Sequence, residues 1–582
     1  MGIFIDRVKV ANFRAIKRLE VSLSPFTVLV GTNNSGKTTF LRALHLALGE
    51  GRKSVSKEDF HIDKGVPAEE IVIDIRIVPI DGNYVRTEKF SDPWFPGLFV
   101  APQIRNEGGR EYIAFRTRIA SDTRKSGGYS FERFNLKQWD DSSDWPDENQ
   151  EGDKTQFLEP IPLYFIDAQR DILQDLREKS SFLGRLSSRI HFDKKKVAKI
   201  EKLLADLNLN IVNESEVLKH LAGRLAELSE TIGTKQAAIE ITPIHKKIRD
   251  IGKGLNIHLA EGDTESLPLD YHGMGTRSWA SLLAIKAFVS WEVQESLNDD
   301  EPFHSILALE EPESHLHPNA QRHLFSQIMQ MEGQKIISTH SPFIASRSNL
   351  ADIRHFSKTA DGSVVGQISE KLKQEEIRKI EREIMNTRGE LLFAKAIVLC
   401  EGSTDEQMLP IFAGEHWGKL HFEKGICFAG TGGGTNYGGF ISFCLSFRIP
   451  WFILGDGEPA IVTALDRTLA GLGLPESNKS PNIILLPDGN KIETYLIAKG
   501  YQSDLKKAIF EMQKEARTND QHQKAKEKEV DQMDDAAIIK FLNKHKTEVA
   551  PYVAEAIIQN SDPKRRIPAE FLQLFQEIDK TI

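Results

Sequence analysis

A glycine-rich segment between an apolar run and an amphipathic run constrains the fold of this chain most strongly. Residues 31–38 are GTNNSGKT, which matches the pattern GxxxxGK[ST], with SPFTVLV before them and TFLRALHLALG after them. Between a strand and a helix, the backbone N–H groups of such a loop surround phosphate oxygens, and the lysine reaches the β- and γ-phosphates. The sequence therefore predicts an α/β domain that binds ATP and Mg²⁺ through Asn34, Gly36, Lys37, Thr38 (also a Mg²⁺ ligand) and Thr39.

A second half of the nucleotide site is expected far along the chain. The apolar run SILAL ends in Glu310 and Glu311, and KIIST ends in His340. A nucleotide-hydrolysing site of this type needs one strand-end acid for Mg²⁺ and a polar group that orients the attacking water. We expect Glu310 to bind the metal, Glu311 to activate water and His340 to sense the γ-phosphate. The simpler alternatives are an acidic surface turn and a structural histidine.

Acidic residues also follow three apolar runs in the last third of the chain. AIVLC leads to Glu401 and Asp405, WFILG leads to Asp456 and Glu458, and Glu493 follows PNIILLPDGNKI. If these runs are parallel strands, the carboxylates meet at one edge of a sheet and repel one another unless cations neutralise them. Oxygen ligands favour Mg²⁺, Mn²⁺ or Ca²⁺, and a pair of such ions can act on a phosphodiester. We therefore predict a metal site there.

The patterning divides the chain into two α/β modules, the first of them split. We expect an antiparallel lobe with one wet face at 70–118 and a surface excursion at 119–158. The predicted segments are 1–171, the first part of the nucleotide module; 172–260, a helical insertion that contacts a second subunit or a partner; 261–365, the second part; 366–390, a charged helical linker; and 391–582, the second module, with an exposed helical insertion near 505–550.

Charge and cysteine content exclude some classes of protein. The 75 Lys and Arg residues against 84 Asp and Glu give a net charge of -9, which excludes a basic coat for nucleic acid but not a local basic groove. The three cysteines lack CxxC spacing, so no disulfide framework is expected. The first apolar run is broken at Asp6 and Arg7, and no run is long enough to span a bilayer. We expect a cytoplasmic protein without membrane contact.

The first module resembles the ATPase heads of the SMC and RecF kind, in the ABC-ATPase superfamily. Asn12-Phe13-Arg14 is similar to their opening strand motif, Gln169 to the Q-loop glutamine, and HGMGTRS, with Gly273 and Gly275, to the signature motif. The resemblance implies nucleotide contacts by Arg14 and Gln169. It also implies a homodimer or higher homo-oligomer, because the signature of one subunit caps the nucleotide of the other. Met274 within the signature and Glu310 in place of Asp depart from the pattern, so we expect a slow switch and not a motor.

The second module resembles a Toprim domain, with Glu401 and Asp405 as the first acids, Asp456 and Glu458 in place of DxD, and Glu493 as the later acid. A Toprim domain after such a head is typical of the OLD (overcoming lysogenization defect) family. The resemblance implies a DNA endonuclease regulated by ATP, in bacterial anti-phage defence, alone or with a helicase-like or retron (reverse transcriptase) partner. A C-terminal lysine of such nucleases stabilises the transition state, for which Lys564 is the candidate, with Arg565 and Arg566 as alternatives.

Two other interpretations stay open at this point. The first is a non-catalytic, ATP-switched repair or structural protein of the RecF or SMC type, although a scaffold has no reason to gather five acids at strand ends. The second is a topoisomerase or primase, which is weaker because nothing in the chain looks like a DNA-gate domain with a tyrosine nucleophile. The sequence does not say whether ATP activates or inhibits cleavage.

Overall fold

The structure is a computed structural model that describes residues 2–49, 55–94, 103–122, 124, 128–155, 161–167, 194–219, 221, 258–259, 266–299, 302–360, 362–514 and 520–582. It falls into two compact units, and neither is continuous in sequence. Unit 1 comprises Met1–Arg14, Ser22–Phe26 and Thr38–Ser338, and unit 2 comprises Ala15–Val21, Thr27–Lys37 and Thr339–Ile582. The domain boundaries expected from the sequence stay predictions.

An antiparallel sheet forms one side of unit 1, as the alternating runs predict. Its strands pair in the order β10-β9-β8-β6-β1, and β7 pairs with β8. The strands are β1 (Gly2–Phe13), β6 (Glu70–Ile80), β7 (Arg105–Glu107), β8 (Arg110–Ser121), β9 (Tyr129–Leu136) and β10 (Glu151–Lys154).

The expected wet face of this lobe is wrong for β6, which is buried on both faces from Ile71 to Ile80. Its charged residues are buried because each has a partner. Asp74 accepts two hydrogen bonds of 2.8 Å from Arg116, and Arg76 donates to Asp6. A buried charge is tolerated when it is paired and hydrogen-bonded. The polar residues that alternate with apolar ones in β6 therefore form internal ion pairs and do not face solvent.

The expected surface excursion at 119–158 is also wrong for residues 128–155. This segment supplies β9 and β10, and it buries Trp139 and Trp145. The indole N–H of Trp145 donates to Asp74, so the tryptophan completes the buried ion pair. The polar composition of the segment gave no indication that these two tryptophans are buried.

Short parallel strands complete the first module. In unit 1, β14 (Ile306–Glu310) lies between β11 (Leu163–Ile166) and β15 (Gln334–Ser338). In unit 2, β3 (Phe26–Gly31) pairs in parallel with β16 (Ile353–Thr359), which pairs with β17 (Gly362–Gly366). The other elements of this region are β2 (Ile16–Ser22), α1 (Lys37–Leu48), β4 (Ile62–Asp63), β5 (Val66–Pro67), α4 (Lys194–Glu214), β12 (His258–Leu259), β13 (Leu267–Pro268), α6 (Met274–Asp299), α7 (Pro318–Met329) and α8 (Pro342–Arg347).

The helical insertion predicted at 172–260 contains α4, which confirms helix over 194–214. Most of that range lies outside the described residues. The charged linker is helical as expected, with α9 (Gln374–Ile380), a π-helical turn (Glu381–Met385) and α10 (Asn386–Arg388). None of the described helices is both long enough and apolar enough to cross a membrane.

The C-terminal module is built on a four-stranded parallel sheet, which includes the three apolar runs predicted to lead to the acids. The strand order is β19-β18-β20-β21, with β18 (Ala396–Cys400), β19 (Ile426–Gly430), β20 (Trp451–Gly455) and β21 (Ile483–Leu485). The helices that follow these strands are α11 (Ser403–Trp417), α12 (Tyr437–Phe447), α13 (Pro459–Gly471) and α14 (Ile492–Ala498).

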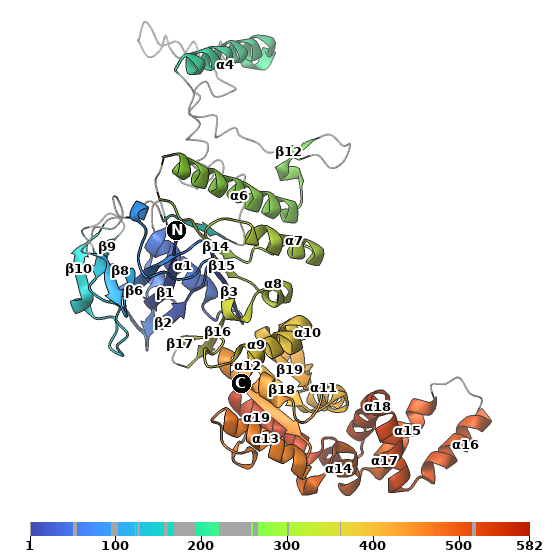
Figure 1. Cartoon of the computed structure of the whole chain (residues 1–582). Coiled ribbons are helices and arrows are strands. Elements are labelled where there is room, and N and C mark those ends of the chain that lie inside the picture. Colours follow the sequence, from blue (N-terminus) through green and yellow to red (C-terminus); the bar gives the residue numbers. More distant parts are fainter. Residues whose placement is uncertain are drawn as a thin grey trace. The chain divides into compact units, whose positions relative to one another are not determined.

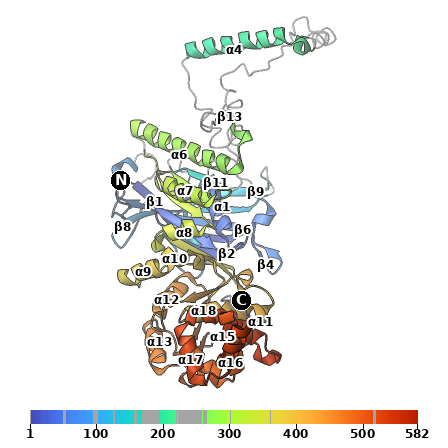
Figure 2. The ribbon, with the colours of Figure 1, turned by 90° about the vertical axis from the view of Figure 1, so that its right-hand side faces the viewer.

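Further helices extend this module at its C-terminal end (Figures 1 and 2). They are α15 (Gln502–Lys514), α16 (Asp520–Asp531), α17 (Asp535–Lys544), α18 (Lys546–Ile558) and α19 (Ala569–Thr581). The expected exposed insertion near 505–550 is only partly exposed, because Val530, Ile538 and Leu542 are buried in the same core as the sheet. The segment therefore belongs to the domain core as well as to its surface.

Candidate active site

The phosphate loop has the backbone that its glycines predict. Gly31 and Gly36 have φ of 132° and 111°, and a Cβ on Gly31 would lie 2.1 Å from the carbonyl oxygen of Phe356. Only glycine fits that approach. Lys37 is buried at the start of α1, and its Nζ donates to the carbonyls of Gly31 and Thr32, each at 2.9 Å. The loop thus folds around the lysine ammonium.

Thr38 and Glu310 lie together in unit 1, although they are far apart in sequence. The Thr38 hydroxyl donates to Glu310 Oε1 at 2.5 Å, and Glu310 Oε2 is buried without a hydrogen-bond partner among the described residues. Burial, helped by the charges of Asp167 and Glu311, raises the pKa of Glu310 against the opposing effects of Thr38 and Arg42. A hydroxyl beside a carboxylate is the ligand pair that a P-loop protein offers to Mg²⁺. The donors therefore fit that ion.

The other expected nucleotide residues are placed as follows. Glu311 has φ of 42°, and Ser314 donates to its carboxylate at 3.3 Å. Arg14 is held by an ion pair to Asp59 at 2.7 Å. Asn34 has φ of 60°, and Thr39 lies half-buried on α1. Gly273 precedes α6, and Gly275 lies within the first turn of that helix, where a Cβ in place of its hydrogen would lie 2.7 Å from the His315 carbonyl oxygen. The ring of His340 is 6.4 Å from that of Phe393, and Gln169 lies outside the described residues.

Parallel pairing gathers the predicted acids of the C-terminal module, here called the acid cluster: Glu401, Asp405, Asp456, Glu458 and Glu493. Glu401 follows β18 and Asp456 follows β20, and these two strands are neighbours, so their carboxyl ends meet. The charge of Glu401 acts on Asp456, so the two carboxyl groups lie close together. Asp405 lies in the first turn of α11, where the N–H of Gly402 donates to it at 3.4 Å.

The electrostatics of the acid cluster indicate unneutralised negative charge. Burial raises the pKa of Asp405 to about 7, with the charges of Glu401 and Glu493 adding to the shift and the Gly402 N–H opposing it. Burial and the charges of Glu401 and Asp405 also raise the pKa of Asp456. In the described structure Glu401 Oε2 is buried and accepts no hydrogen bond. A bound cation would relieve each of these costs.

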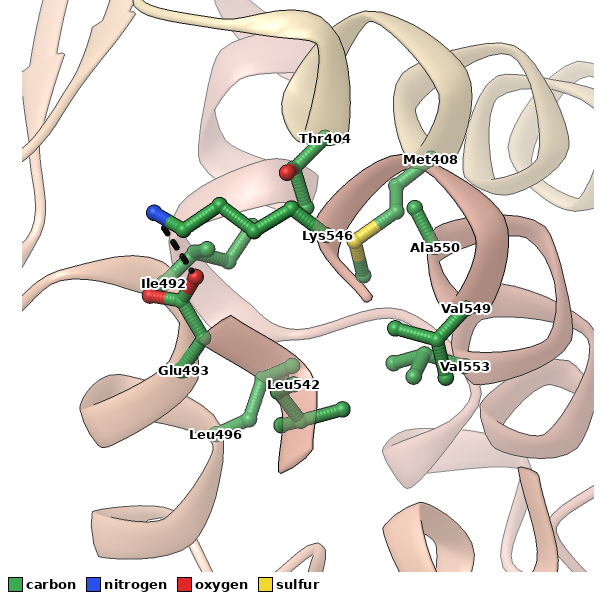
Figure 3. A pocket seen from close by; sticks show the side chains of 10 residues that line it. All are labelled: Thr404, Met408, Ile492, Glu493, Leu496, Leu542, Lys546, Val549, Ala550 and Val553. Carbon is green, nitrogen blue, oxygen red and sulfur yellow. Dashed lines mark ion pairs between the residues drawn. The ribbon is translucent and has the colours of Figure 1, made fainter. Parts of the chain in front are cut away.

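Two lysines that the sequence did not single out hold the remaining acids. Lys491 pairs with Glu458 at 3.3 Å, and Lys546 pairs with Glu493 at 3.3 Å. Figure 3 shows the second pair beside a pocket lined by Thr404, Met408, Ile492, Leu496, Leu542, Val549, Ala550 and Val553. Lys491 stands two residues before a predicted acid and could have been suspected. Lys546 approaches from the start of α18, and no local pattern announces it.

Within the part of the chain that the structure describes, no three His, Cys, Asp or Glu side chains are arranged to hold a metal ion as they stand. Glu458 and Glu493 are turned to their lysines. The donor set still fits a hard cation, because it consists of oxygens alone and includes an unpartnered carboxylate oxygen. Lys564, the predicted catalytic lysine, lies on a 3-10 turn (Pro563–Arg565), where its backbone N–H donates to Asp562.

Comparison with protein families assigns both modules. Residues 26–346 match the family described as "AAA domain, putative AbiEii toxin, Type IV TA system". Residues 392–457 match the family described as "Overcoming lysogenization defect protein-like, TOPRIM domain". The first match extends from the phosphate-loop strand past His340, and the second includes Glu401, Asp405 and Asp456. The predicted succession of an ATPase part and a Toprim domain is confirmed.

Two nuclease relatives agree with this assignment. An OLD nuclease of Thermus scotoductus is 25% identical over 479 residues, which are 78% of this chain and 82% of the relative. The Old nuclease of Escherichia phage P2 is 24% identical over 432 residues, 70% of this chain and 69% of the relative. The solved C-terminal region of the Xanthomonas campestris pv. campestris OLD protein is 19% identical and has a TM-score of 0.26, covering 33% of this chain and 96% of that one.

Proposed function

The chain belongs to the AAA-domain family matched at residues 26–346, and it is a metal-dependent nuclease of the OLD family with ATPase activity. From this premise we propose that it cleaves DNA at the acid cluster under the control of ATP. The observation that carries the proposal is the set of mutually repelling acids at the ends of β18 and β20, half-buried at Glu401 and Asp456 and buried at Asp405. A cation site accounts for such an arrangement, because bound cations relieve the repulsion.

We assign the metal ligands to Glu401, Asp405 and Asp456, with Glu458 and Glu493 completing the set. Divalent ions held there, Mg²⁺, Mn²⁺ or Ca²⁺, would supply charge stabilisation at the attacking and leaving oxygens of a phosphodiester. The protein holds these carboxylates in place before the ions bind. In the metal-free chain Glu458 is paired to Lys491, and Glu493 is paired to Lys546. The ammonium groups of the two lysines therefore lie at the site where a phosphate would be neutralised.

Two lysines compete for the role of stabilising the phosphate in the transition state. Lys546 is supported by its ion pair with Glu493. Lys564 is supported by the family resemblance alone. Substitution of each by Met keeps the aliphatic stem and removes the charge, so a large loss of cleavage in only one of the two variants identifies the residue.

For the nucleotide, we assign the phosphates to Asn34, Gly36, Lys37 and Thr39, the Mg²⁺ to Thr38 and Glu310, and the attacking water to Glu311. Arg14, Gln169 and His340 are proposed as further nucleotide contacts. Gly273 and Gly275 are proposed to cap the nucleotide of a second subunit in a homodimer. The unusual Met274 and Glu310 support slow hydrolysis and a switching role.

We further propose that the protein acts on DNA in the bacterial cytoplasm as part of anti-phage defence. The two relatives come from a bacterium and from a phage, which supports that setting. A helicase-like protein or a retron reverse transcriptase would have to supply any activity that this chain lacks.

A plasmid-nicking assay with purified protein tests the proposal. The wild type is titrated with Mg²⁺ and Mn²⁺, with and without ATP, beside Asp456→Ala, Lys37→Ala and the control Asp579→Asn. Asp579 is an ion-paired acid on α19 of the same domain that takes no part in the cluster. We expect Asp456→Ala to lose cleavage and keep ATP binding, and Lys37→Ala to lose ATP binding. Cleavage by Asp456→Ala at the wild-type rate would refute the metal assignment, and ATP binding without cleavage by any variant would favour the non-catalytic alternative.

A further inference from the structure

Tyr437, the first residue of α12, brings a buried hydroxyl to the acid cluster. Its side chain is 1% exposed, and its Oη has no hydrogen-bond partner among the described residues. A Cβ built on Gly455 would lie 3.3 Å from that Oη, so the hydroxyl stands beside the residue that precedes Asp456. A buried hydroxyl without a partner loses its hydrogen bonds to water and gains none in return.

Glu401 Oε2, in the same acid cluster, is also buried without a hydrogen-bond partner among the described residues. The loop that leads into α12 packs on this residue: the N–H of Gly433 donates to the Glu401 carbonyl at 2.9 Å, and a Cβ on Gly434 would lie 3.1 Å from the Glu401 carboxyl carbon. Burial, and then the charge of Glu401, raise the pKa of Tyr437 well above its ordinary value. A phenol hydroxyl can act only as a donor toward a carboxylate.

An ordinary core tyrosine is the alternative explanation, and Tyr495 shows what that looks like in this domain. Tyr495 is 0% exposed, and its hydroxyl donates to Glu570. Buried tyrosines usually find such a partner. Among the described residues Tyr437 lacks such a partner, and the acid cluster holds a carboxylate oxygen, Glu401 Oε2, that accepts no hydrogen bond there.

We propose that Tyr437 is a positioning residue of the nuclease site, whose hydroxyl donates to the Glu401 carboxylate when the acid cluster holds its divalent ions. The hydrogen bond fixes the orientation of Glu401 as a ligand, and groups that orient ligands in this way strengthen metal binding. The inference rests on the proposed metal role of the acid cluster.

The test compares Tyr437→Phe with the matched control Tyr495→Phe in the full chain. Mn²⁺ affinity is measured by calorimetric titration of protein stripped with EDTA, with Asp456→Asn defining the part of the signal that belongs to the acid cluster. Stability is measured as the urea midpoint in EDTA. We expect Tyr437→Phe to weaken Mn²⁺ binding at the cluster by about tenfold, the lower end for groups that orient metal ligands. Its urea midpoint should equal or exceed that of the wild type, because an unsatisfied hydroxyl is removed. Tyr495→Phe should do the reverse, lowering the midpoint and leaving Mn²⁺ affinity unchanged.

Unchanged Mn²⁺ affinity in Tyr437→Phe, or a lower urea midpoint, would overturn the positioning role and leave the metal site standing. A Tyr437→Phe chain that does not fold would overturn it too, since that result makes the tyrosine structural. If the wild type shows no Mn²⁺ binding that Asp456→Asn removes, the metal site itself fails, and this inference fails with it.

Discussion

Asp405→Asn is expected to make the metal-free protein more stable at neutral and alkaline pH, although it removes a proposed metal ligand. Asp405 is 8% exposed, and its pKa rises from 3.8 to about 7 in the folded chain, mainly through burial and then through the charges of Glu401 and Glu493. A carboxyl group whose folded-state pKa is raised binds its proton more tightly in the folded state. Folding is then opposed wherever the carboxyl must ionise.

The sign and size follow from proton linkage. Well below pH 3.8 the group is protonated in both states and costs nothing. Between about pH 4 and pH 7 the folded state holds more protons, so the free energy of unfolding falls as the pH rises. Above pH 7 the full penalty applies, and a shift of about three units corresponds to about 4 kcal/mol at ~1.4 kcal/mol per unit. Relaxation of the site makes this an upper bound. Asparagine cannot ionise, and its Oδ1 can still accept from the Gly402 N–H that now contacts Asp405 at 3.4 Å.

The assay is scanning calorimetry of the full chain in EDTA at several pH values from 4 to 9. At pH 8 we expect Asp405→Asn to raise the Tm of the transition that contains the Toprim domain, by up to roughly 8–16 °C at 2–4 °C per kcal/mol. At pH 4 the two proteins should melt together. Mg²⁺ should stabilise the wild type more than the variant, since binding to the folded state adds stability. Asp579→Asn is a control for which the opposite change in stability is expected. Burial raises the pKa of Asp579, but hydrogen bonds from Lys424, His416 and Trp417 outweigh burial and lower that pKa. This variant should therefore lose stability. A lower Tm for Asp405→Asn at pH 8, or a gain that does not depend on pH, would refute the electrostatic argument.

Three more outcomes are expected. Gly31→Ala should abolish ATP binding in a fluorescent-nucleotide assay and lower stability by more than the roughly 1–3 kcal/mol of a strained backbone, because its Cβ would also meet a carbonyl at 2.1 Å; wild-type ATP affinity would contradict this. Arg116→Met should cost about 3–5 kcal/mol in urea denaturation, since it leaves Asp74 charged and buried; a loss below 1 kcal/mol would show that the lobe adapts. Lys546→Met should lower kcat for plasmid nicking at least tenfold, whereas Lys564→Met should change it less than twofold; the reverse order would return the role to Lys564.

The parts of the fold that sequence patterns predicted are those encoded by neighbouring residues. The phosphate loop is one continuous motif, and the strands at 306–310, 396–400 and 451–455 are apolar runs that end in acids. The meeting of Glu401 with Asp456 followed from one further rule, that neighbouring parallel strands bring their carboxyl ends together. Local information and one topological rule were enough for these features.

The features that patterns missed depend on partners far away in sequence. The burial of Asp74 requires Arg116 and Trp145, which lie on other segments, so its alternation with apolar residues looked like a solvent-facing strand. Lys546 reaches Glu493 only because α18, which begins with Lys546, packs in the same hydrophobic core as α14, which carries Glu493. In each case the side chain is polar, and its place in the fold is decided by a partner that no nearby residue identifies.

Helix α12 links the two activities within unit 2. Its C-terminal residue Phe447 packs against strands of the phosphate-loop sheet: the rings of Phe447 and His355 on β16 are 6.4 Å apart, and a Cβ on Gly366 of β17 would lie 2.6 Å from the Phe447 backbone. β16 in turn pairs with β3, the strand that ends at Gly31. The N-terminal residue of α12 is Tyr437, at the acid cluster. One short helix therefore packs on the strands beside the nucleotide loop at its C-terminal end and carries Tyr437 beside Gly455 at its N-terminal end, so the proposed control by ATP has a direct packing route within unit 2.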